Sequence, residues 1–326
     1  MEISSVLLAA GRGKRMRPLT DRIPKPALPV LDVPLAAWGL AALTRHAGPT
    51  VVNVSHLADQ VVAALRRTGI DGWEPFVEGV EAFGTAGTLR ALRERFGPRV
   101  VTWNGDALTD LHLPDLLASH VEARAPATLL VREVDTMADL TLEGSSVTGF
   151  VDRRKDPDVP GGRFLGMAVF EREALDRLPD HRPAGLGETL LRELANSGDL
   201  NVHLFDGYLR DVGTPAEYLQ ASLDVLNGRA LAPPIELPGE VIERKAGLAY
   251  VGPDVEAPAD SVGPGGIVLA GGEVQRGAHI TNSVVFPGRA VPTGTRLDGA
   301  IWLDGPLALK ETLAGDPGPP LRSDFR

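Results

Sequence analysis

The chain contains no cysteine among its 326 residues. Disulfide bonds, thiolate zinc sites and cysteine nucleophiles are therefore excluded, and a cytoplasmic location is the simplest expectation. Long hydrophobic runs are also missing, because no apolar stretch approaches the roughly 18 residues that cross a bilayer. Hydrophobic residues nevertheless make up 43% of the chain, which is the composition of a folded globular protein.

Positive charge is scarce, with 33 Lys and Arg residues against 43 Asp and Glu residues and a net charge of -10. Nucleic acids and anionic membranes bind broad basic surfaces, so neither is an expected partner. A phosphate-bearing ligand needs a local basic site, and one short segment offers it. Its basic residues are Arg12, Lys14, Arg15, Arg17, Arg22 and Lys25. Lysine is rare elsewhere, which draws attention to Lys25.

The first 228 residues alternate between strand and helix patterns. Strands are predicted over 3–8, 51–54, 74–78, 100–103 and 127–133, and helices over 35–47, 56–68, 86–95 and 113–123. This alternation predicts an α/β fold, with a Rossmann-like, mixed but mainly parallel sheet that is flanked by helices. Strands over 140–151 and 163–170 are predicted at a mixed edge of the sheet, followed by helices over 171–178 and 187–197.

The end of this region carries clear turn and capping signals. Residues 200–212 are predicted to form a hairpin that turns at Asp206-Gly207. Thr214, Pro215 and Glu217 have the spacing of a capping box at the start of a helix, which continues to Asn227-Gly228. We therefore predict a domain over residues 1–228 and a linker over 229–246.

The pattern changes from about residue 247. Helical periodicity disappears, and aliphatic residues recur at close to six-residue spacing between glycine and proline. They are Val255, Val262, Ile267, Val274, Ile280, Val284, Val291 and Leu297. This spacing predicts about three β-helix-like coils over 247–309. The alternative is an irregular appendage rich in proline and glycine. Residues 310–326 are predicted to be a flexible tail.

The strongest chemical signal is the basic loop of residues 9–26, AAGRGKRMRPLTDRIPKP, which follows the first strand. A glycine pair after a strand lets backbone N–H groups approach phosphate closely. The loop is not a dinucleotide fingerprint, because Met16 stands where the third glycine belongs, and no Walker A pattern is present. The spacing of arginine and lysine, with prolines fixing the loop, gives two cations that can converge on a triphosphate.

This loop resembles the signature of the sugar-phosphate nucleotidyltransferases, also called nucleotide-sugar pyrophosphorylases. Further matches follow in order over residues 1–228. They are the segments 51–60, 81–88, Asn104-Gly105-Asp106 and 211–215. The pattern is most similar to mannose 1-phosphate guanylyltransferases and N-acetylmuramate 1-phosphate uridylyltransferases. The resemblance implies the nucleotide-diphospho-sugar transferase type of fold, and a left-handed β-helix-like carboxyl-terminal domain is common in the former group.

The resemblance also implies the roles of the residues that meet the nucleotide. Arg15 is expected to hold the departing β- and γ-phosphates, and Lys25 to bridge the α-phosphate and the acceptor phosphate. These two are the predicted catalytic residues. The nucleotide is expected to bind at Ala10, Gly11, Gly13, Gly84, Thr85 and Ala86. The last three belong to a small-residue turn that allows a base to lie against the backbone.

Asp106 and Asp211 are the predicted metal ligands. Asp106 follows a buried strand, at the sheet edge where ligands bind in open α/β sheets. One or two carboxylates, completed by phosphate oxygens and water, are typical of a magnesium site. The expected cofactor is therefore Mg²⁺. The competing interpretation is that each aspartate serves only its local turn.

The acceptor side departs from the family pattern, because Asp152 and Arg153 stand where the family carries Glu-Lys and the following proline is missing. Arg153, Arg154 and Lys155 are all candidates for the acceptor phosphate, and a solvated charged turn is the alternative. The predicted acceptor-binding residues are Asn104, Asp152, Arg153, Gly166 and Glu188.

The resulting hypothesis is an enzyme that joins a nucleoside triphosphate to a sugar 1-phosphate and releases pyrophosphate, with mannose-1-phosphate guanylyltransferase activity favoured. The alternatives are uridylyl or thymidylyl transfer to another sugar 1-phosphate, and a non-catalytic regulatory homologue that binds nucleotide-sugar. The expected partners are the two substrates, together with a second copy of the chain bound through the carboxyl-terminal domain. The sequence names neither the base nor the sugar.

Overall fold

The structure is a computed structural model that describes residues 3–79, 81–229, 235–307 and 309. The segment predicted as a flexible tail, 310–326, lies outside these residues. The described residues form two compact units. We call those of 3–11, 39–107 and 111–207 the sheet unit, and those of 12–38, 108–110 and 208–309 the loop-and-coil unit. No helix in the described ranges has both the length and the apolar character needed to cross a bilayer.

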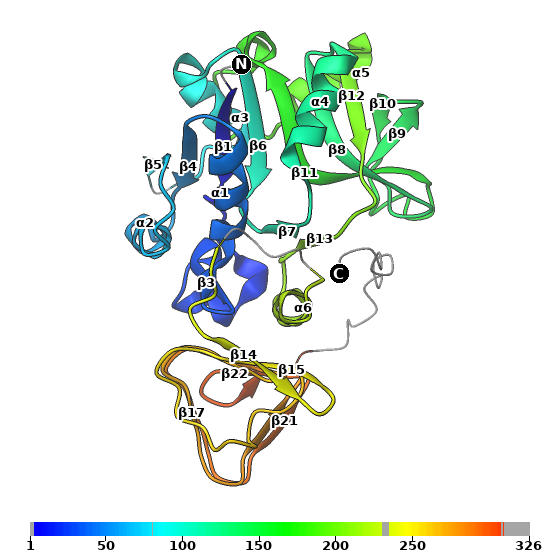
Figure 1. Cartoon of the computed structure of the whole chain (residues 1–326). Coiled ribbons are helices and arrows are strands. Elements are labelled where there is room, and N and C mark those ends of the chain that lie inside the picture. Colours follow the sequence, from blue (N-terminus) through cyan, green and yellow to red (C-terminus); the bar gives the residue numbers. More distant parts are fainter. Residues whose placement is uncertain (1–2, 80, 230–234, 308, 310–326) are drawn as a thin grey trace. The chain divides into compact units, whose positions relative to one another are not determined.

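A nine-stranded sheet forms the centre of the sheet unit (Figure 1). Its strands in spatial order are β5 (Trp73–Val77), β4 (Thr50–Val54), β1 (Ile3–Leu8), β6 (Arg99–Asn104), β11 (Gly161–Glu171), β8 (Ala127–Val134), β12 (Leu200–Leu204), β10 (Ser146–Phe150) and β9 (Leu140–Glu143). The first four run parallel, as do β8 and β12, whereas β11 is antiparallel to both of its neighbours. The predicted mixed α/β sheet is therefore confirmed.

Helices cover both faces of this sheet. Side chains alternate between the two faces along each strand, so apolar side chains on both faces have to be buried by other elements. The helices of the unit are α1 (Leu35–His46, of which 39–46 belong here), α2 (Ala58–Arg66), α3 (Gly84–Leu92), α4 (Leu113–Ala123) and α5 (Leu190–Ser197). Leucines of α3 and α5 pack on Val6, Val100 and Leu129. Gly39 of α1 lies against Trp103, on the opposite face. These buried faces make the strands a rigid support for the loops at their carboxyl ends.

Two sequence predictions about this sheet are corrected. Residues 200–212 are not a hairpin, because β12 pairs in parallel with β8 inside the sheet, and β13 (Leu209–Asp211) pairs with β7 (Ala107–Thr109) instead. Strand β11 is interior rather than at an edge. In both cases a strand is buried by pairing with strands distant in sequence, which local turn signals cannot reveal. Only β9 and β10 lie at the predicted mixed edge.

The amino-terminal part of the loop-and-coil unit is built from very short elements. Three 3-10 helices, Lys14–Met16, Leu19–Asp21 and Lys25–Ala27, follow the first glycines. Strands β2 (Pro29–Val30) and β3 (Val33–Pro34) then form an antiparallel ribbon before α1 begins. Prolines and glycines prevent a longer helix here, so each turn of the loop depends on tertiary contacts.

Helix α6 (Pro215–Leu226) begins as its sequence predicts. The hydroxyl of Thr214 accepts a hydrogen bond from the backbone N–H of Glu217 at 3.2 Å. The reciprocal half of the capping box is not made by the Glu217 carboxylate, which pairs with Arg210 instead. An ion pair with a cation outweighs a bond to one more backbone N–H at a partly exposed helix end.

The carboxyl-terminal strands are β14 (Glu240–Arg244), β15 (Gly247–Val251), β16 (Ile267–Val268), β17 (Glu273–Val274), β18 (His279–Thr281), β19 (Val284–Val285), β20 (Ala290–Val291), β21 (Arg296–Asp298), β22 (Ile301–Trp302) and β23 (Pro306–Leu307). Strands β15, β16, β19 and β22 stack in parallel with a 17-residue offset, which relates Tyr250, Ile267, Val284 and Ile301. Strands β14 and β23 instead pair antiparallel with β15 and β22. Viewed end-on in Figure 1, these coils form a triangle. Val268, Val274 and Ile280 belong to its apolar core.

Candidate active site

One set of predicted site residues lies in the sheet unit, at the carboxyl ends of β1 and β6. The backbone N–H of Gly105 donates to the carbonyl oxygen of Leu8 at 2.9 Å, which joins the start of the basic loop to the Asn104-Gly105-Asp106 turn. Asp106 is partly exposed beside this turn. Ala10 is nearly buried, whereas Gly11 is exposed and has nothing within 4 Å of its missing Cβ. The turn therefore has room for a ligand next to Gly11.

Two of the predicted acceptor-binding residues, Asn104 and Gly166, touch each other. Gly166 has a φ of +80°, and a Cβ placed on it would lie 2.3 Å from the side-chain nitrogen of Asn104. Only glycine fits there. The backbone of Gly166 therefore lies directly against the Asn104 amide, which is a polar group able to recognise a hydroxyl.

The predicted base-recognition turn opens helix α3 and docks on a second segment of the sheet unit. Gly84 has a φ of +75°, and the N–H of Ala86 donates to the carbonyl oxygen of Ala184 at 3.0 Å. The hydroxyl of Thr85 accepts the N–H of Leu186 at 3.0 Å. Glu188 follows in this same segment and is exposed. The structure therefore brings a predicted acceptor residue near the predicted base turn.

A buried polar network that the sequence analysis missed supports the same turn. Asn53 accepts the N–H of Ala9 at 2.6 Å and donates to Glu78 at 2.8 Å. Thr88 of α3 also donates to Glu78, whose other oxygen accepts the N–H of Phe83 at 2.8 Å. The Asn53, Glu78 and Thr88 side chains are at most 5% exposed. The sequence signal that could have revealed this network was one asparagine inside the valine-rich strand over 51–54.

Changing Glu78 to glutamine is expected to destabilise this turn. The carboxylate accepts bonds from three different donors, whereas an amide would present its own N–H groups to some of them. We expect the free energy of unfolding to fall by about 1–3 kcal/mol. Urea denaturation of Glu78→Gln beside Glu81→Gln, an exposed glutamate on the same loop, measures the difference. Equal midpoints for the two variants would contradict a supporting role for Glu78.

The predicted acceptor cations lie in an exposed turn after β10. Arg153 pairs with Asp139 at 3.2 Å, and Lys155 with Asp152 at 3.5 Å. Residues 152–158 are all exposed. Exposed ion pairs contribute little stability, so an incoming phosphate can displace them. The geometry is equally that of a solvated charged turn, and it selects none of Arg153, Arg154 and Lys155.

In the loop-and-coil unit, Lys25 is tightly placed. Its side chain is only 8% exposed. Gly13 has a φ of +62°, and a Cβ on it would lie 2.9 Å from the Cβ of Lys25. Thr20 closes the loop by donating its hydroxyl to the carbonyl oxygen of Gly13 at 2.9 Å. The glycine thus serves the packing of Lys25, in addition to the approach to phosphate that is predicted for it.

Arg15 and Asp211 belong to the same unit and are linked through Gly213. A Cβ on Gly213 would lie 3.1 Å from Nη2 of Arg15, so this guanidinium rests against bare backbone. The N–H of Gly213 donates to the carbonyl oxygen of Asp211 at 2.9 Å. Both Arg15 and Asp211 are exposed. The predicted phosphate-holding cation and one predicted metal ligand are therefore neighbours within this unit.

Changing Gly213 to alanine is expected to displace Arg15 with little effect on folding. The backbone of Gly213 does not have a positive φ, so alanine is tolerated there, but its methyl group would push the guanidinium away. We expect turnover to fall by about tenfold or more. Steady-state kinetics of Gly213→Ala beside Gly305→Ala, whose added Cβ would meet nothing within 4 Å, isolates the effect. Equal activity in both variants would show that Arg15 needs no such contact.

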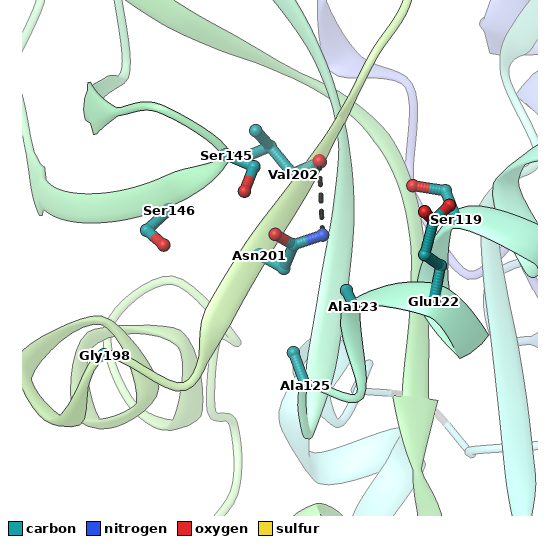
Figure 2. A pocket seen from close by; sticks show the side chains of 9 residues that line it. All are labelled: Ser119, Glu122, Ala123, Ala125, Ser145, Ser146, Gly198, Asn201 and Val202. Carbon is teal, nitrogen blue, oxygen red and sulfur yellow. Dashed lines mark hydrogen bonds between the residues drawn. The ribbon is translucent and has the colours of Figure 1, made fainter.

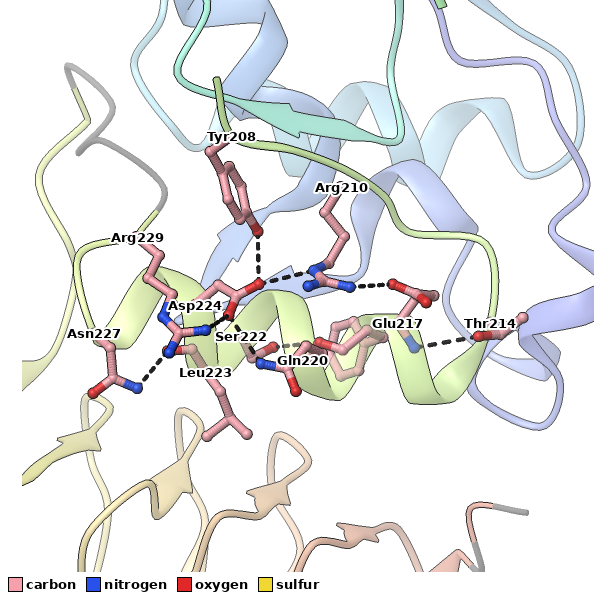
Figure 3. Close-up of polar contacts among 11 residues, drawn as sticks. Tyr208, Arg210, Thr214, Glu217, Gln220, Ser222, Leu223, Asp224, Asn227 and Arg229 are labelled. Atoms are coloured by element: carbon pink, nitrogen blue, oxygen red, sulfur yellow. Dashed lines mark hydrogen bonds and ion pairs between the residues drawn. The ribbon is translucent and has the colours of Figure 1, made fainter. Parts of the chain in front are cut away.

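An ion-pair network anchors β13, the strand that ends at Asp211 (Figure 3). Arg210 donates to Asp224 at 2.8 Å and also pairs with Glu217, both on α6. Tyr208 donates to the same oxygen of Asp224 at 3.0 Å. Burial, together with the nearby Asp224 charge, raises the pKa of Tyr208 well above its ordinary value. With residues 208 and 210 both held by α6, the backbone that carries Asp211 is fixed.

A separate polar hollow of about 440 Å³ lies on the sheet unit (Figure 2). Its lining residues are Ser119, Glu122, Ala123, Ala125, Ser145, Ser146, Gly198, Asn201 and Val202. Among these described residues none is a predicted nucleotide, acceptor or metal residue. Asn201 turns its amide to the carbonyl oxygen of Val202 at 3.3 Å. This hollow is therefore not part of the predicted site.

Comparison with known proteins decides the family. Residues 4–228 match the family model described as nucleotidyl transferase. The chain belongs to this family. The matched residues include all of the motifs on which the resemblance rested. This nucleotidyltransferase is thus an enzyme of the class expected from its basic loop.

Two curated relatives align over most of this nucleotidyltransferase. A mannose-1-phosphate guanylyltransferase of Mycobacterium tuberculosis is 30% identical over 321 residues, which cover 93% of this chain and 80% of the relative. A UTP–glucose-1-phosphate uridylyltransferase of Synechocystis is 28% identical, with coverage of 90% and 86%. A crystal structure of HddC from Yersinia pseudotuberculosis, complexed with GMP-PN, has a TM-score of 0.57 at 19% identity, covering 69% of this chain and 100% of that one. The last likeness concerns the fold alone.

The described residues contain no group of three or more histidine and acidic side chains that could hold a metal by themselves. The donors predicted here are two carboxylates. All-oxygen donors of this kind fit Mg²⁺, which takes few protein ligands and keeps water and substrate phosphates around it. Both Asp106 and Asp211 have solvent-accessible side chains. The donor chemistry is therefore compatible with magnesium.

Proposed function

We propose that this nucleotidyltransferase joins GTP to mannose 1-phosphate, giving GDP-mannose and pyrophosphate. The observation that carries the choice is the guanylyltransferase relative at 30% identity, whose alignment spans 93% of the chain. The uridylyltransferase relative, at 28%, keeps uridylyl transfer to another sugar 1-phosphate as the second candidate. Thymidylyl transfer remains a third outcome of the same assay.

The reaction is an in-line displacement at the α-phosphorus of the nucleotide. An oxygen of the sugar phosphate forms the new bond, the bond from the α-phosphorus to the bridging oxygen breaks, and pyrophosphate leaves with the electron pair. Such a step needs positioning and charge neutralisation more than a covalent nucleophile. Lys25, a compact point charge, follows the charge from attack to departure, and Arg15 holds the leaving β- and γ-phosphates in a planar fork.

Asp106 and Asp211 are the residues that would hold Mg²⁺. A bound ion would supply positive charge to the phosphate oxygens. The nucleotide lies against Ala10, Gly11 and Gly13, with its base at the turn of Gly84, Thr85 and Ala86. Asn104 and Gly166 bind the sugar, together with Glu188. Asp152 and Arg153 belong to the acceptor side, where Arg153, Arg154 and Lys155 are the candidate cations for the acceptor phosphate.

The domain organisation is part of this proposal. Residues 1–228 are the catalytic domain, 229–246 a linker and 247–309 a short left-handed β-helix-like domain. The 17-residue parallel stacking supports the last assignment, because it equals two intervals of six and one of five, close to the six-residue spacing of a β-helix. We propose that these coils also contribute to a homo-oligomer, which sedimentation of a chain truncated after Gly228 would test.

Competition among substrates tests the proposed pair. The full chain is incubated with Mg²⁺, with equal concentrations of GTP, UTP, dTTP, ATP and CTP, and with one sugar 1-phosphate at a time. Mass spectrometry of the products then identifies the base and the sugar. GDP-mannose as the dominant product supports the proposal. UDP- or dTDP-sugar as the dominant product would replace it with the second or third candidate.

A further inference from the structure

The coils contact the loop that carries Lys25, through the ribbon of β2 and β3. The two residues that turn this ribbon, Leu31 and Asp32, have φ values of +49° and +62°. Non-glycine residues seldom adopt this conformation, and a pair of them persists only where surrounding structure holds them. Leu31 is fully buried. The stability of the turn therefore has to come from its contacts.

Both carboxylate oxygens of Asp32 are bound by the coils. Oδ1 accepts the backbone N–H of Ala270 at 3.0 Å, and Oδ2 accepts the hydroxyl of Tyr250 at 3.0 Å. Gly252 leaves room for this carboxylate, since a Cβ there would lie 2.3 Å from Oδ2. The Tyr250 hydroxyl also accepts the N–H of Gly239 at 3.0 Å. Burial raises the pKa of Asp32, and the bonds from Ala270 and Tyr250 oppose that rise.

A second contact holds the other end of the ribbon. The hydroxyl of Tyr218, on α6, donates to the carbonyl oxygen of Pro29. The ring of Tyr218 meets the ring of Phe286, from the coils, edge to face at 6.0 Å. Tyr218 and Tyr250 are both fully buried. The ribbon is thus held at its turn by the coils and at its base by a helix that packs on the coils.

The ribbon in turn fixes Lys25. The N–H of Leu28 donates to the carbonyl oxygen of Lys25 at 3.1 Å, and β2 starts at the next residue, Pro29. The N–H of Leu35, which follows β3, donates to the carbonyl oxygen of Leu28 at 2.8 Å, so both ends of the ribbon are joined at Leu28. Very few residues separate Lys25 from the ribbon that these contacts hold, so movement of the ribbon moves Lys25.

We propose that Asp32 and Tyr250 are positioning residues for nucleotidyl transfer, through which the carboxyl-terminal coils hold Lys25 in its catalytic place. The coils act on the reaction without touching substrate. This inference rests on the proposed function of Lys25. It assigns the coils a role within a single chain, in addition to any role in self-association.

The test uses the full chain with Tyr250→Phe, which removes one hydroxyl, and Asp32→Ala, which removes both acceptors. The matched control is Trp302→Phe, which loses a hydrogen bond from Trp302 to Ala290 within the coils and does not involve the ribbon. Two readouts are taken from each folded variant. One is kcat and KM, and the other is the rate at which an amine-acylating reagent modifies Lys25 relative to exposed Lys14, followed by mass spectrometry.

We expect both ribbon variants to lower kcat by on the order of 10- to 100-fold with little change in KM, and to raise acylation of Lys25 but not of Lys14. Trp302→Phe should change neither kcat nor the acylation of Lys25 relative to Lys14. Unchanged Lys25 acylation in folded Tyr250→Phe and Asp32→Ala would overturn the positioning role. Raised acylation with unchanged kcat would also overturn it. Substitution of Lys25 itself then distinguishes failure of the proposed function from failure of the positioning role alone.

Discussion

Replacing Lys25 with methionine is expected to lower turnover by on the order of 100- to 1000-fold, the usual loss when one preorganised charge is removed from a transition state. The methionine keeps most of the apolar stem of a residue that is only 8% exposed. The fold should therefore survive, and the loss should appear in kcat. Kinetics of Lys25→Met, with circular dichroism to check folding, measure it.

Lys14 provides the matched control for this substitution. It lies in the same basic loop but is exposed, and its change to methionine should leave turnover within about twofold of the parent, as for surface positions in general. The same variant pair separates the enzyme from the non-catalytic homologue. In a regulator that only binds nucleotide-sugar, Lys25→Met would leave function largely intact, and the parent would release no pyrophosphate.

Asp106→Asn and Asp211→Asn are each expected to reduce activity by about two to three orders of magnitude at low magnesium. An asparagine keeps the shape of the side chain but loses the charge that attracts a divalent cation. The dependence of rate on Mg²⁺ concentration should shift to higher concentration in both variants. Isothermal titration with Mn²⁺ in the presence of nucleotide provides a readout that is independent of turnover.

Asp206→Asn is the control for these two changes, because Asp206 is exposed and precedes β13. Its magnesium dependence should match that of the parent. If Asp106→Asn and Asp211→Asn also behaved like the parent, the two aspartates would be turn residues, which is the competing interpretation of their sequence motifs. A shift in only one of them would leave a single protein carboxylate as the metal ligand.

Much of the fold could be predicted because its signals are local. Apolar runs such as 3–8 and 100–103 are buried strands in the structure, and Pro215 begins a helix where its capping residue places it. The family was predictable for a related reason. The glycines and cations of the basic loop must follow the first strand at fixed spacing, and such spacing is visible in a single sequence.

The errors and omissions concern contacts between distant residues. Asp206-Gly207 has the chemistry of a hairpin turn, yet the next strand pairs with β7, where Thr109 donates its hydroxyl to the carbonyl oxygen of Tyr208. No local sequence signal predicts that pairing. Likewise, Gly213 resembles any glycine before a helix, and only the fold places the Arg15 guanidinium over it. No local signal marks Asp32 either, because its partner Tyr250 lies 218 residues later.

Pyrophosphate release measures nucleotidyl transfer by this chain most directly. The parent protein, with Mg²⁺, is supplied with nucleoside triphosphate alone, with sugar 1-phosphate alone and with both together. We predict pyrophosphate only when both are present, in an amount equal to the nucleotide-sugar formed, with GTP and mannose 1-phosphate as the most active pair. Folded protein that releases no pyrophosphate with any pair of substrates would contradict nucleotidyl transfer by this chain.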